Sequence, residues 1–112
     1  MNPVQAQPSD TATAAANTAV TLTYAAHTDG QAHVVGEIIA SYSAVPTGGN
    51  LTIEDGAGTT VFQADITAAG PVAIVFDPPI ASRRNTALII TLAAGGTSVV
   101  GKLNARHWTI VP

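Results

Sequence analysis

Hydrophobic and polar residues alternate along most of this chain with the period of two that is typical of half-buried β-strands. The clearest case is residues 18–26, TAVTLTYAA, in which Val20, Leu22 and Tyr24 share one face and threonines occupy the other. Later segments repeat this pattern. Their predicted inward positions are Leu51, Ile53, Phe62, Ala64, Ile66, Val72, Ile74, Phe76, Leu88, Ile90, Leu92, Trp108 and Ile110. Among these, we expect Trp108 to anchor the core near the C-terminus, beside the first strand.

Turn sequences separate the alternating segments at intervals typical of an all-β domain. The clearest are PTGGN at residues 46–50, DGAG at 55–58, DPP at 77–79 and GG at 95–96. Glycine, proline and asparagine in such clusters mark the ends of strands and the tips of hairpins. The sequence therefore predicts an all-β, antiparallel β-sandwich of about eight strands, of jelly-roll or Greek-key type. Residues 33–66 are predicted to form a three-stranded meander within it, and the overall strand order is left open.

One strand, residues 33–42, is apolar on both faces. One face carries Val34, Ile38, Ala40 and Tyr42, and the other carries Val35 and Ile39. A small sandwich has a single core, so it covers only one of these faces. We therefore predict that Val35 and Ile39 lie at an interface, either in a homo-oligomer (a dimer or trimer) or against another protein.

The first 17 residues lack the alternating pattern. They are rich in Ala, Gln, Thr and Pro, and Val4 is their last large apolar residue. The predicted organisation is a flexible N-terminal arm over residues 1–17 and a β-sandwich domain over residues 18–112. Pro3 and Pro8 favour an extended arm, and we predict that it docks on a neighbouring protein through Pro3, Val4 and Pro8. A passive tail is the competing interpretation.

Composition favours a protein partner and disfavours several other classes of partner. Charged residues make up 10% of the chain, against a usual share of about 25%, so a protein partner could cover its surface at little desolvation cost. A net charge of −3 disfavours nucleic-acid binding, which requires a basic face. No apolar run approaches the roughly 18 residues of a membrane span, and no signal peptide is expected. The absence of cysteine excludes disulfides and thiolate zinc sites.

The ionisable residues do not form a recognisable reactive motif. His27, His33 and His107 are scattered along the sequence, and His33 and Glu37 would lie about 13 Å apart on a strand. Glu54 and Asp55 are interpreted as the end of a hairpin rather than as calcium ligands. No serine lies in a G-x-S-x-G motif, and the paired glycines lie between strands, not before a helix. We therefore predict no catalytic, cofactor-binding or metal-ligating residue, no cofactor and no enzymatic activity.

Roughly residues 18–107 resemble small β-rich proteins encoded in the structural gene clusters of tailed bacteriophages. The residues that carry the resemblance are Ser41–Ser43, Pro46–Leu51, Glu54–Gly56, Asp65–Pro71, Asn85–Leu88 and Gly101–Asn104. Proteins of this class and size are often capsid cement or decoration proteins, and others are neck, fibre or tail components. The resemblance implies no catalytic residue.

These observations predict a virion structural protein. The leading hypothesis is a cement or decoration protein that binds the major capsid protein on the outer surface of a phage head and stabilises the joints between capsomers. It would be located on the capsid surface after assembly in the bacterial host cytoplasm. The alternative is a neck, head-fibre or tail-associated β-sandwich. A third hypothesis, a carbohydrate-binding module or small hydrolase, is disfavoured because the aromatic residues fall mostly on predicted inward positions.

Overall fold

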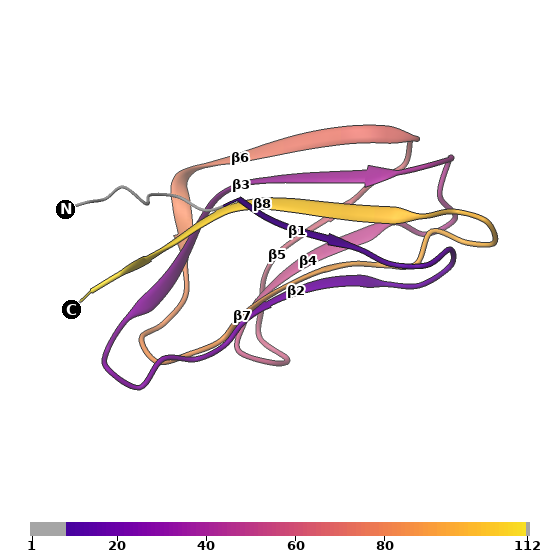
Figure 1. Cartoon of the computed structure of the whole chain (residues 1–112). Helices are drawn as coiled ribbons and strands as arrows, with labels where there is room; N and C mark the ends of the chain where they lie inside the picture. Colours follow the sequence, from indigo (N-terminus) through magenta and orange to yellow (C-terminus); the bar gives the residue numbers. More distant parts are fainter. Residues whose placement is uncertain (1–8, 112) are drawn as a thin grey trace.

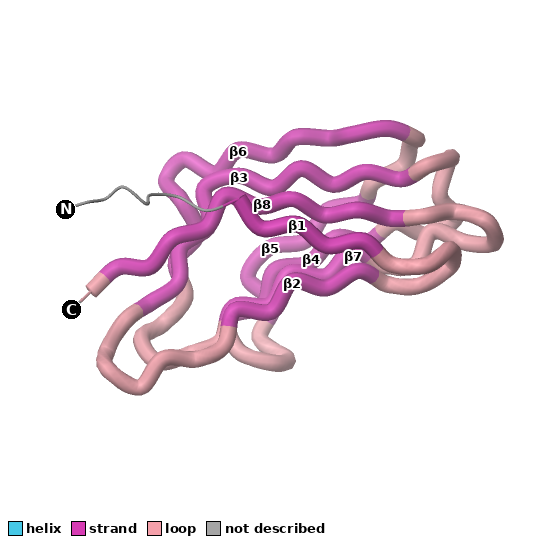
Figure 2. The backbone as a smooth tube through the Cα atoms, viewed as in Figure 1, coloured by secondary structure: helices cyan, strands magenta, loops and turns pink. Residues whose placement is uncertain are grey.

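The computed structural model of this chain describes residues 9–111, which form two antiparallel β-sheets facing one another (Figure 1). The eight strands are β1 (Ser9–Thr13), β2 (Val20–Tyr24), β3 (Ala32–Tyr42), β4 (Asn50–Asp55), β5 (Thr60–Asp65), β6 (Gly70–Ala81), β7 (Leu88–Leu92) and β8 (Gly101–Ile110). Figure 2 shows that loops alone connect them. In this part of the chain no helix is long and apolar enough to cross a membrane. The predicted all-β antiparallel sandwich is confirmed.

The two sheets each contain four strands, in the orders β1-β8-β3-β6 and β2-β7-β4-β5. Only β4 and β5 are both consecutive in the chain and paired with one another, so most connections cross from one sheet to the other. The predicted meander over residues 33–66 is therefore wrong, because β3 lies in the first sheet and β4 and β5 lie in the second. The chain runs back and forth between two opposite ends of the sandwich (Figure 1).

The core lies between the sheets and contains most of the predicted inward residues. Val20, Ile38, Ala40, Tyr42, Leu51, Ile53, Ile66, Leu88, Ile90 and Leu92 are all buried there. Burial is less complete at the side where the edge strands β5 and β6 face each other. Phe62 and Phe76 meet there edge to face, with ring centroids 5.0 Å apart, and both are only partly buried. This side of the sandwich is closed by aromatic rings rather than by strand pairing.

A β-bulge in β3 reverses the faces predicted for its first half. The register of β3 shifts between Val35 and Glu37 against both β6 and β8, which places the bulge at Gly36. Val35 consequently points into the core and is 0% exposed, whereas Ile39 lies half-buried on the outer face. The prediction of an interface position is therefore wrong for Val35, since the bulge moves its side chain inward.

The C-terminal strand also differs from the prediction. The buried positions of β8 are Gly101, Leu103, Ala105 and His107. Trp108 therefore lies on the outer face of the sheet, where its ring covers Gly36: a Cβ on Gly36 would meet two ring carbons at 3.0 Å. Ile110 is 42% exposed. The prediction that Trp108 and Ile110 lie in the core is wrong, because the odd-numbered residues of β8 point inward and the even-numbered residues point outward.

Strand structure begins earlier than the predicted boundary at residue 18. Strand β1 pairs antiparallel with β8, from Ser9 opposite Arg106 to Thr13 opposite Lys102. Ala12 and Ala14 pack against the core. Part of the predicted arm is thus a strand of the sandwich. The predicted contact residues Pro3, Val4 and Pro8 lie outside the described residues.

Candidate functional site

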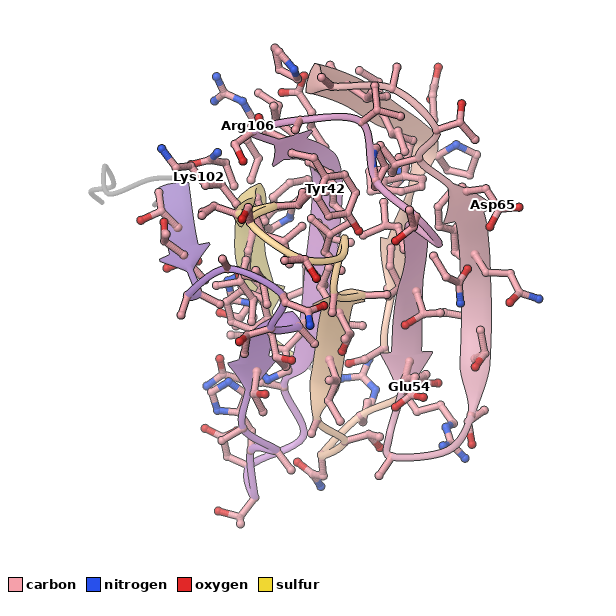
Figure 3. All side chains as sticks on the ribbon, turned by 90° about the vertical axis from the view of Figure 1, so that its right-hand side faces the viewer. Tyr42, Glu54, Asp65, Lys102 and Arg106 are labelled. Carbon is pink, nitrogen blue, oxygen red and sulfur yellow. The ribbon has the colours of Figure 1, made fainter. Side chains whose placement is uncertain are left out.

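Four of the six segments that carry the sequence resemblance meet at one end of the sandwich, around Tyr42, whereas Glu54–Gly56 and Asn85–Leu88 lie together at the other end. The Tyr42 hydroxyl donates a hydrogen bond to the carbonyl oxygen of Ala93 at 2.6 Å, and burial raises the pKa of this hydroxyl. Its ring lies so close to Gly49 and Gly95 that a Cβ at either glycine would approach it within about 3.0 Å. Figure 3 shows Tyr42 in the interior and charged side chains such as Arg106 and Asp65 at the periphery.

Backbone hydrogen bonds join the loops at this Tyr42 end. The N–H of Thr47 donates to the oxygen of Gly95 at 2.8 Å, and that of Ile66 donates to the oxygen of Gly49 at 2.8 Å. Ser43 and Val100 are joined by a backbone bond and by a bond to the Ser43 hydroxyl, each 2.9 Å long. The shared motifs therefore fix loop geometry, and this accounts for their residue types in structural terms.

The opposite end of the sandwich contains a cluster of ionisable and aromatic side chains. It comprises Asp10 of β1, Tyr24 of β2, His27 of the following loop, His33 of β3 and His107 of β8, which we call the histidine cluster. The three histidines are thus gathered in space, contrary to the interpretation that they are scattered. Alternation with Leu103 and Ala105 could have predicted that His107 points inward. That His33 lies beside it could not be predicted, because their contact requires the pairing of β3 with β8.

A chain of hydrogen bonds connects two of these histidines to the backbone. Nε2 of His33 lies 2.7 Å from the oxygen of Ala25, which can only accept, so this nitrogen is the donor. In neutral His33, Nδ1 is then the acceptor, and it lies 2.9 Å from Nε2 of His107. His107 therefore donates through Nε2, and its Nδ1 faces the Asp10 carboxylate at 3.8 Å.

Packing and burial favour the neutral forms of His107 and Tyr24. The ring of Tyr24 stacks on that of His107 with centroids 3.7 Å apart and an angle of 6°. Burial lowers the pKa of His107 to about 4, neighbouring His33 and His27 act in the same direction, and Asp10 opposes them. Burial and the nearby Asp10 raise the pKa of Tyr24. Within residues 9–111, the buried atoms Tyr24 Oη and His27 Nε2 have no hydrogen-bond partner.

Asp55, the predicted hairpin end, anchors the loop between β6 and β7. It is 7% exposed and accepts two hydrogen bonds from Arg83, from the backbone N–H at 3.0 Å and from Nε at 2.9 Å. Nη2 of Arg83 also donates to the Asp55 backbone oxygen at 2.9 Å. Among the described residues, no group of three or more His, Asp or Glu side chains could hold a metal ion.

We expect Asp55→Asn to lower the free energy of unfolding by about 1–3 kcal/mol, the range for a hydrogen bond to a charged group. The amide nitrogen cannot accept a hydrogen bond, so one of the two donors of Arg83 loses its partner on this side chain. Chemical denaturation measures the change. Exposed Asp29, which accepts hydrogen bonds from nearby Gln31, provides the control variant Asp29→Asn, for which little change is expected. An equal loss in both variants would contradict the anchoring role.

The outer face of the first sheet carries a second polar group. Arg106 Nε and a Glu37 oxygen form an ion pair at 3.0 Å beside the bulge. They border a shallow hollow of about 70 Å³, which Ile39, Asn104 and Ala105 also line. Trp108 lies on the same face, two residues after Arg106 in β8. This face offers an aromatic ring, a charged pair and an amide.

Comparison with known proteins yields structural neighbours but no family. No family model and no curated protein matches the sequence. The carbohydrate-binding module CBM36 in complex with calcium and xylotriose is 14% identical, with a TM-score of 0.40 over 88% of this chain and 78% of that chain. The CBM36-1 domain of a multidomain xylanase from the hindgut metagenome of Trinervitermes trinervoides is 10% identical, with a TM-score of 0.44 over 85% and 73%.

A viral particle protein is also among the neighbours. The chain of the virus-like particle of Macrobrachium rosenbergii extra small virus is 15% identical, with a TM-score of 0.33 over 96% of this chain and 82% of that chain. Identities this low concern the fold alone. With TM-scores of 0.33 to 0.44, these neighbours support no inference about the function of this chain.

Proposed function

We propose that this chain is a virion structural protein of a tailed bacteriophage, which binds the outer surface of the head as a cement or decoration protein. The observation that carries the proposal is the resemblance to phage structural proteins, four of whose six motif segments converge around Tyr42. Residues dispersed over more than half of the chain thus form one connected unit. This supports a resemblance that extends through the fold rather than one confined to isolated turns.

The surface offers contacts suited to a large protein partner. Large hydrophobic residues that are exposed within the described chain are Val45, Val61, Val75, Ile110 and Val111. Val61 and Val75 lie on the edge strands β5 and β6, whose outer backbone groups have no strand partner within residues 9–111. Extended segments bind such edges by adding a strand. In the proposed function, the major capsid protein is the partner, and a dimer or trimer would use the outer face around Ile39.

The N-terminal segment provides a second proposed contact. Strand β1 is an edge strand, and eight residues precede it. If extended, eight residues reach at most about 28 Å, which is enough to bridge to an adjacent protein. We therefore propose that residues 1–8, rather than 1–17, form the docking arm. This segment includes all three contact residues predicted from the sequence, Pro3, Val4 and Pro8.

Deleting residues 2–8 is expected to leave the melting temperature within about 2 °C of the full chain, because all eight strands remain. The deletion should reduce the number of copies bound to purified heads at least tenfold. Binding is measured by adding labelled protein to heads that lack it and counting copies after sedimentation. A matched variant with residues 2–8 replaced by Gly and Ser keeps the length and tests whether side chains matter. Full binding by both variants would contradict the docking role.

Labelling of intact virions tests the location itself. Antibody or gold label over the whole head surface is the result expected for a cement or decoration protein. Label confined to the neck, fibres or tail would favour the alternative structural role and overturn the head assignment.

One observation favours a second candidate function, carbohydrate binding. Trp108, expected in the core, instead lies on the outer face beside the Arg106–Glu37 pair. An aromatic ring with neighbouring hydrogen-bonding groups is a common arrangement for stacking a sugar. Glycan-array binding that disappears in Trp108→Ala would favour this function over the proposed one.

A further inference from the structure

We infer that the histidine cluster is an acid-sensitive switch that controls the docking of strand β1. The cluster holds β1 against β8 while the His33–His107 pair carries at most one additional proton, and a second proton releases the strand. The other seven strands stay folded, because they supply most of the core. The switch is a property of the fold and does not depend on the docking role proposed for residues 1–8.

The hydrogen bond between the two imidazoles limits how many protons the pair can hold. His33 and His107 are 4% and 8% exposed, and Nδ1 of His33 lies 2.9 Å from Nε2 of His107. One of these nitrogens must donate and the other must accept. With one additional proton, either ring can be the cation and the bond remains. With two, both nitrogens are donors on cationic rings, so the bond is lost and the rings repel one another.

Asp10 links the protonation of this pair to strand β1. Nε2 of His33 donates to the oxygen of Ala25, so an additional proton leaves Nδ1 of His107 protonated whichever ring is the cation. That nitrogen faces the Asp10 carboxylate at 3.8 Å. Asp10 is the only charged residue of β1, and it lies opposite Ala105 of β8. The pair with one additional proton therefore gives β1 an ionic contact across the sheet.

Strand β1 has few other contacts that would keep it docked. It is an edge strand, paired only with β8, and Ala12 is its one residue that packs against the core. A strand with so little buried apolar surface belongs to the part of a fold that opens at the lowest free energy. Loss of the contact at Asp10 is therefore expected to open β1 before any other strand.

The surroundings of the pair provide one anionic partner. The ionisable groups that face it are Asp10 of β1, Tyr24 of β2 and His27 of the following loop. Glu37 and Arg106, on β3 and β8, pair with one another on the outer face. Beside this half of β3, strand β6 contributes Ile80 and Ala81, which carry no charge. In the described chain the buried Tyr24 Oη and His27 Nε2 also lack hydrogen-bond partners, a penalty that opening to water removes.

The direction of the pH dependence follows from the burial of His107. Burial lowers the pKa of His107 to about 4, His33 and His27 act in the same direction, and Asp10 opposes them. An exposed histidine has a pKa of about 6.5, so the released form binds the second proton more readily than the docked form. The stability of docking is fully present above about pH 6.5 and is lost as the pH falls toward 4.

A single introduced thiol tests the release, because the chain contains no cysteine. In full-length Ala12→Cys the thiol packs against the core while β1 is docked. The exposed position Ala57→Cys provides the reference rate, and Ala64→Cys, on the edge strand β5 of the other sheet, is the matched control. Labelling uses 4,4′-dithiodipyridine, which reacts with thiols at acidic pH. Circular dichroism at each pH shows whether the sandwich remains folded.

Between pH 7.0 and 4.5, the Ala12→Cys rate relative to the reference is expected to rise at least about tenfold. The pKa of about 4 in the docked form and about 6.5 in the released form set an upper value of about 50-fold. The relative rate of Ala64→Cys should change by less than about threefold, since β5 carries no part of the cluster. An equal rise at both positions, or no rise at Ala12→Cys, would overturn the inference.

Asp10→Asn in the Ala12→Cys background tests the link to β1 without removing a buried histidine, which could unfold the chain. At pH 5.5 the variant should label at least about fivefold faster than the Asp10 protein, because the protonated pair has lost its anion. At pH 8.0, where His107 has no proton on Nδ1, the two rates should agree within about twofold. An equal acceleration at both pH values would indicate a merely structural role and overturn the switch.

Nitrogen-15 NMR of the imidazoles provides an independent measurement on the wild-type chain. At pH 8.0 both His33 and His107 should be neutral and protonated at Nε2. On acidification, the second proton should enter the pair over the same pH range in which Ala12→Cys becomes reactive. Two fully protonated rings in a chain whose Ala12→Cys thiol is still protected would overturn the inference.

Discussion

Replacing Tyr42 with alanine is expected to lower the free energy of unfolding by about 3–5 kcal/mol, the usual range for deleting a buried aromatic side chain. Tyr42 is 1% exposed, and its ring fills the space between the loops that carry Gly49 and Gly95. The two glycines themselves have no side chain that could fill the cavity. The loss should therefore fall in the upper part of the range.

Tyr42→Phe separates the contribution of the ring from that of the hydroxyl. The phenylalanine keeps the packing but leaves the oxygen of Ala93 without its 2.6 Å donor, so a loss of about 1–2 kcal/mol is expected. Urea denaturation followed by circular dichroism measures both variants. A loss below 1 kcal/mol for Tyr42→Ala would show that the shared motifs do not depend on Tyr42, and would weaken the structural account of the resemblance.

Alternation along the sequence was sufficient to predict much of the fold. Leu88, Ile90 and Leu92 are buried as predicted, because β7 is a regular strand with pairing on both sides. The turn at residues 55–58 separates β4 from β5, as its Asp and Gly residues indicated. Such features depend on local chemistry, so they can be inferred without knowing which strands pair.

The predictions are wrong where strand pairing over long sequence distances, or an irregularity such as a bulge, determines which side chains point inward. Gly36 interrupts β3, and a glycine within a strand often marks a bulge, but the sequence does not show which face changes. His33 and His107 are 74 positions apart and meet only because β3 pairs with β8. Strand β1 was missed because its inward residue is Ala12, too small to produce a clear hydrophobic pattern.

Val35→Lys is expected to remove at least about 4 kcal/mol of stability, and thus to unfold the domain or nearly so. Val35 is 0% exposed and belongs to the core that also contains Ile38 and Leu103. Its inward direction comes from the bulge at Gly36, so the lysine ammonium would lie in the buried core, opposite His107 of β8. The chain must then either bury an unpaired charge or open the sandwich.

Ile39→Lys is the matched control, on the same strand but on the outer face. Ile39 is half-buried beside the hollow that Glu37 borders, so a lysine there can reach water and a carboxylate. The expected change in unfolding free energy is about 1 kcal/mol or less. If the outer face forms the proposed dimer or trimer, this variant should also sediment as a smaller species than the wild type.

Urea denaturation measures the stability of both variants, and sedimentation velocity measures their association. Together they test whether Val35 and Ile39 point in opposite directions. The sequence pattern alone placed Val35 and Ile39 on one exposed face, which predicts a folded protein with weakened association in both cases. The bulge predicts an unfolded or severely destabilised Val35→Lys and a folded Ile39→Lys. A folded Val35→Lys with a stability near that of the wild type would contradict the inward direction of Val35. It would also return Gly36 to an unbroken strand and restore the register predicted from alternation.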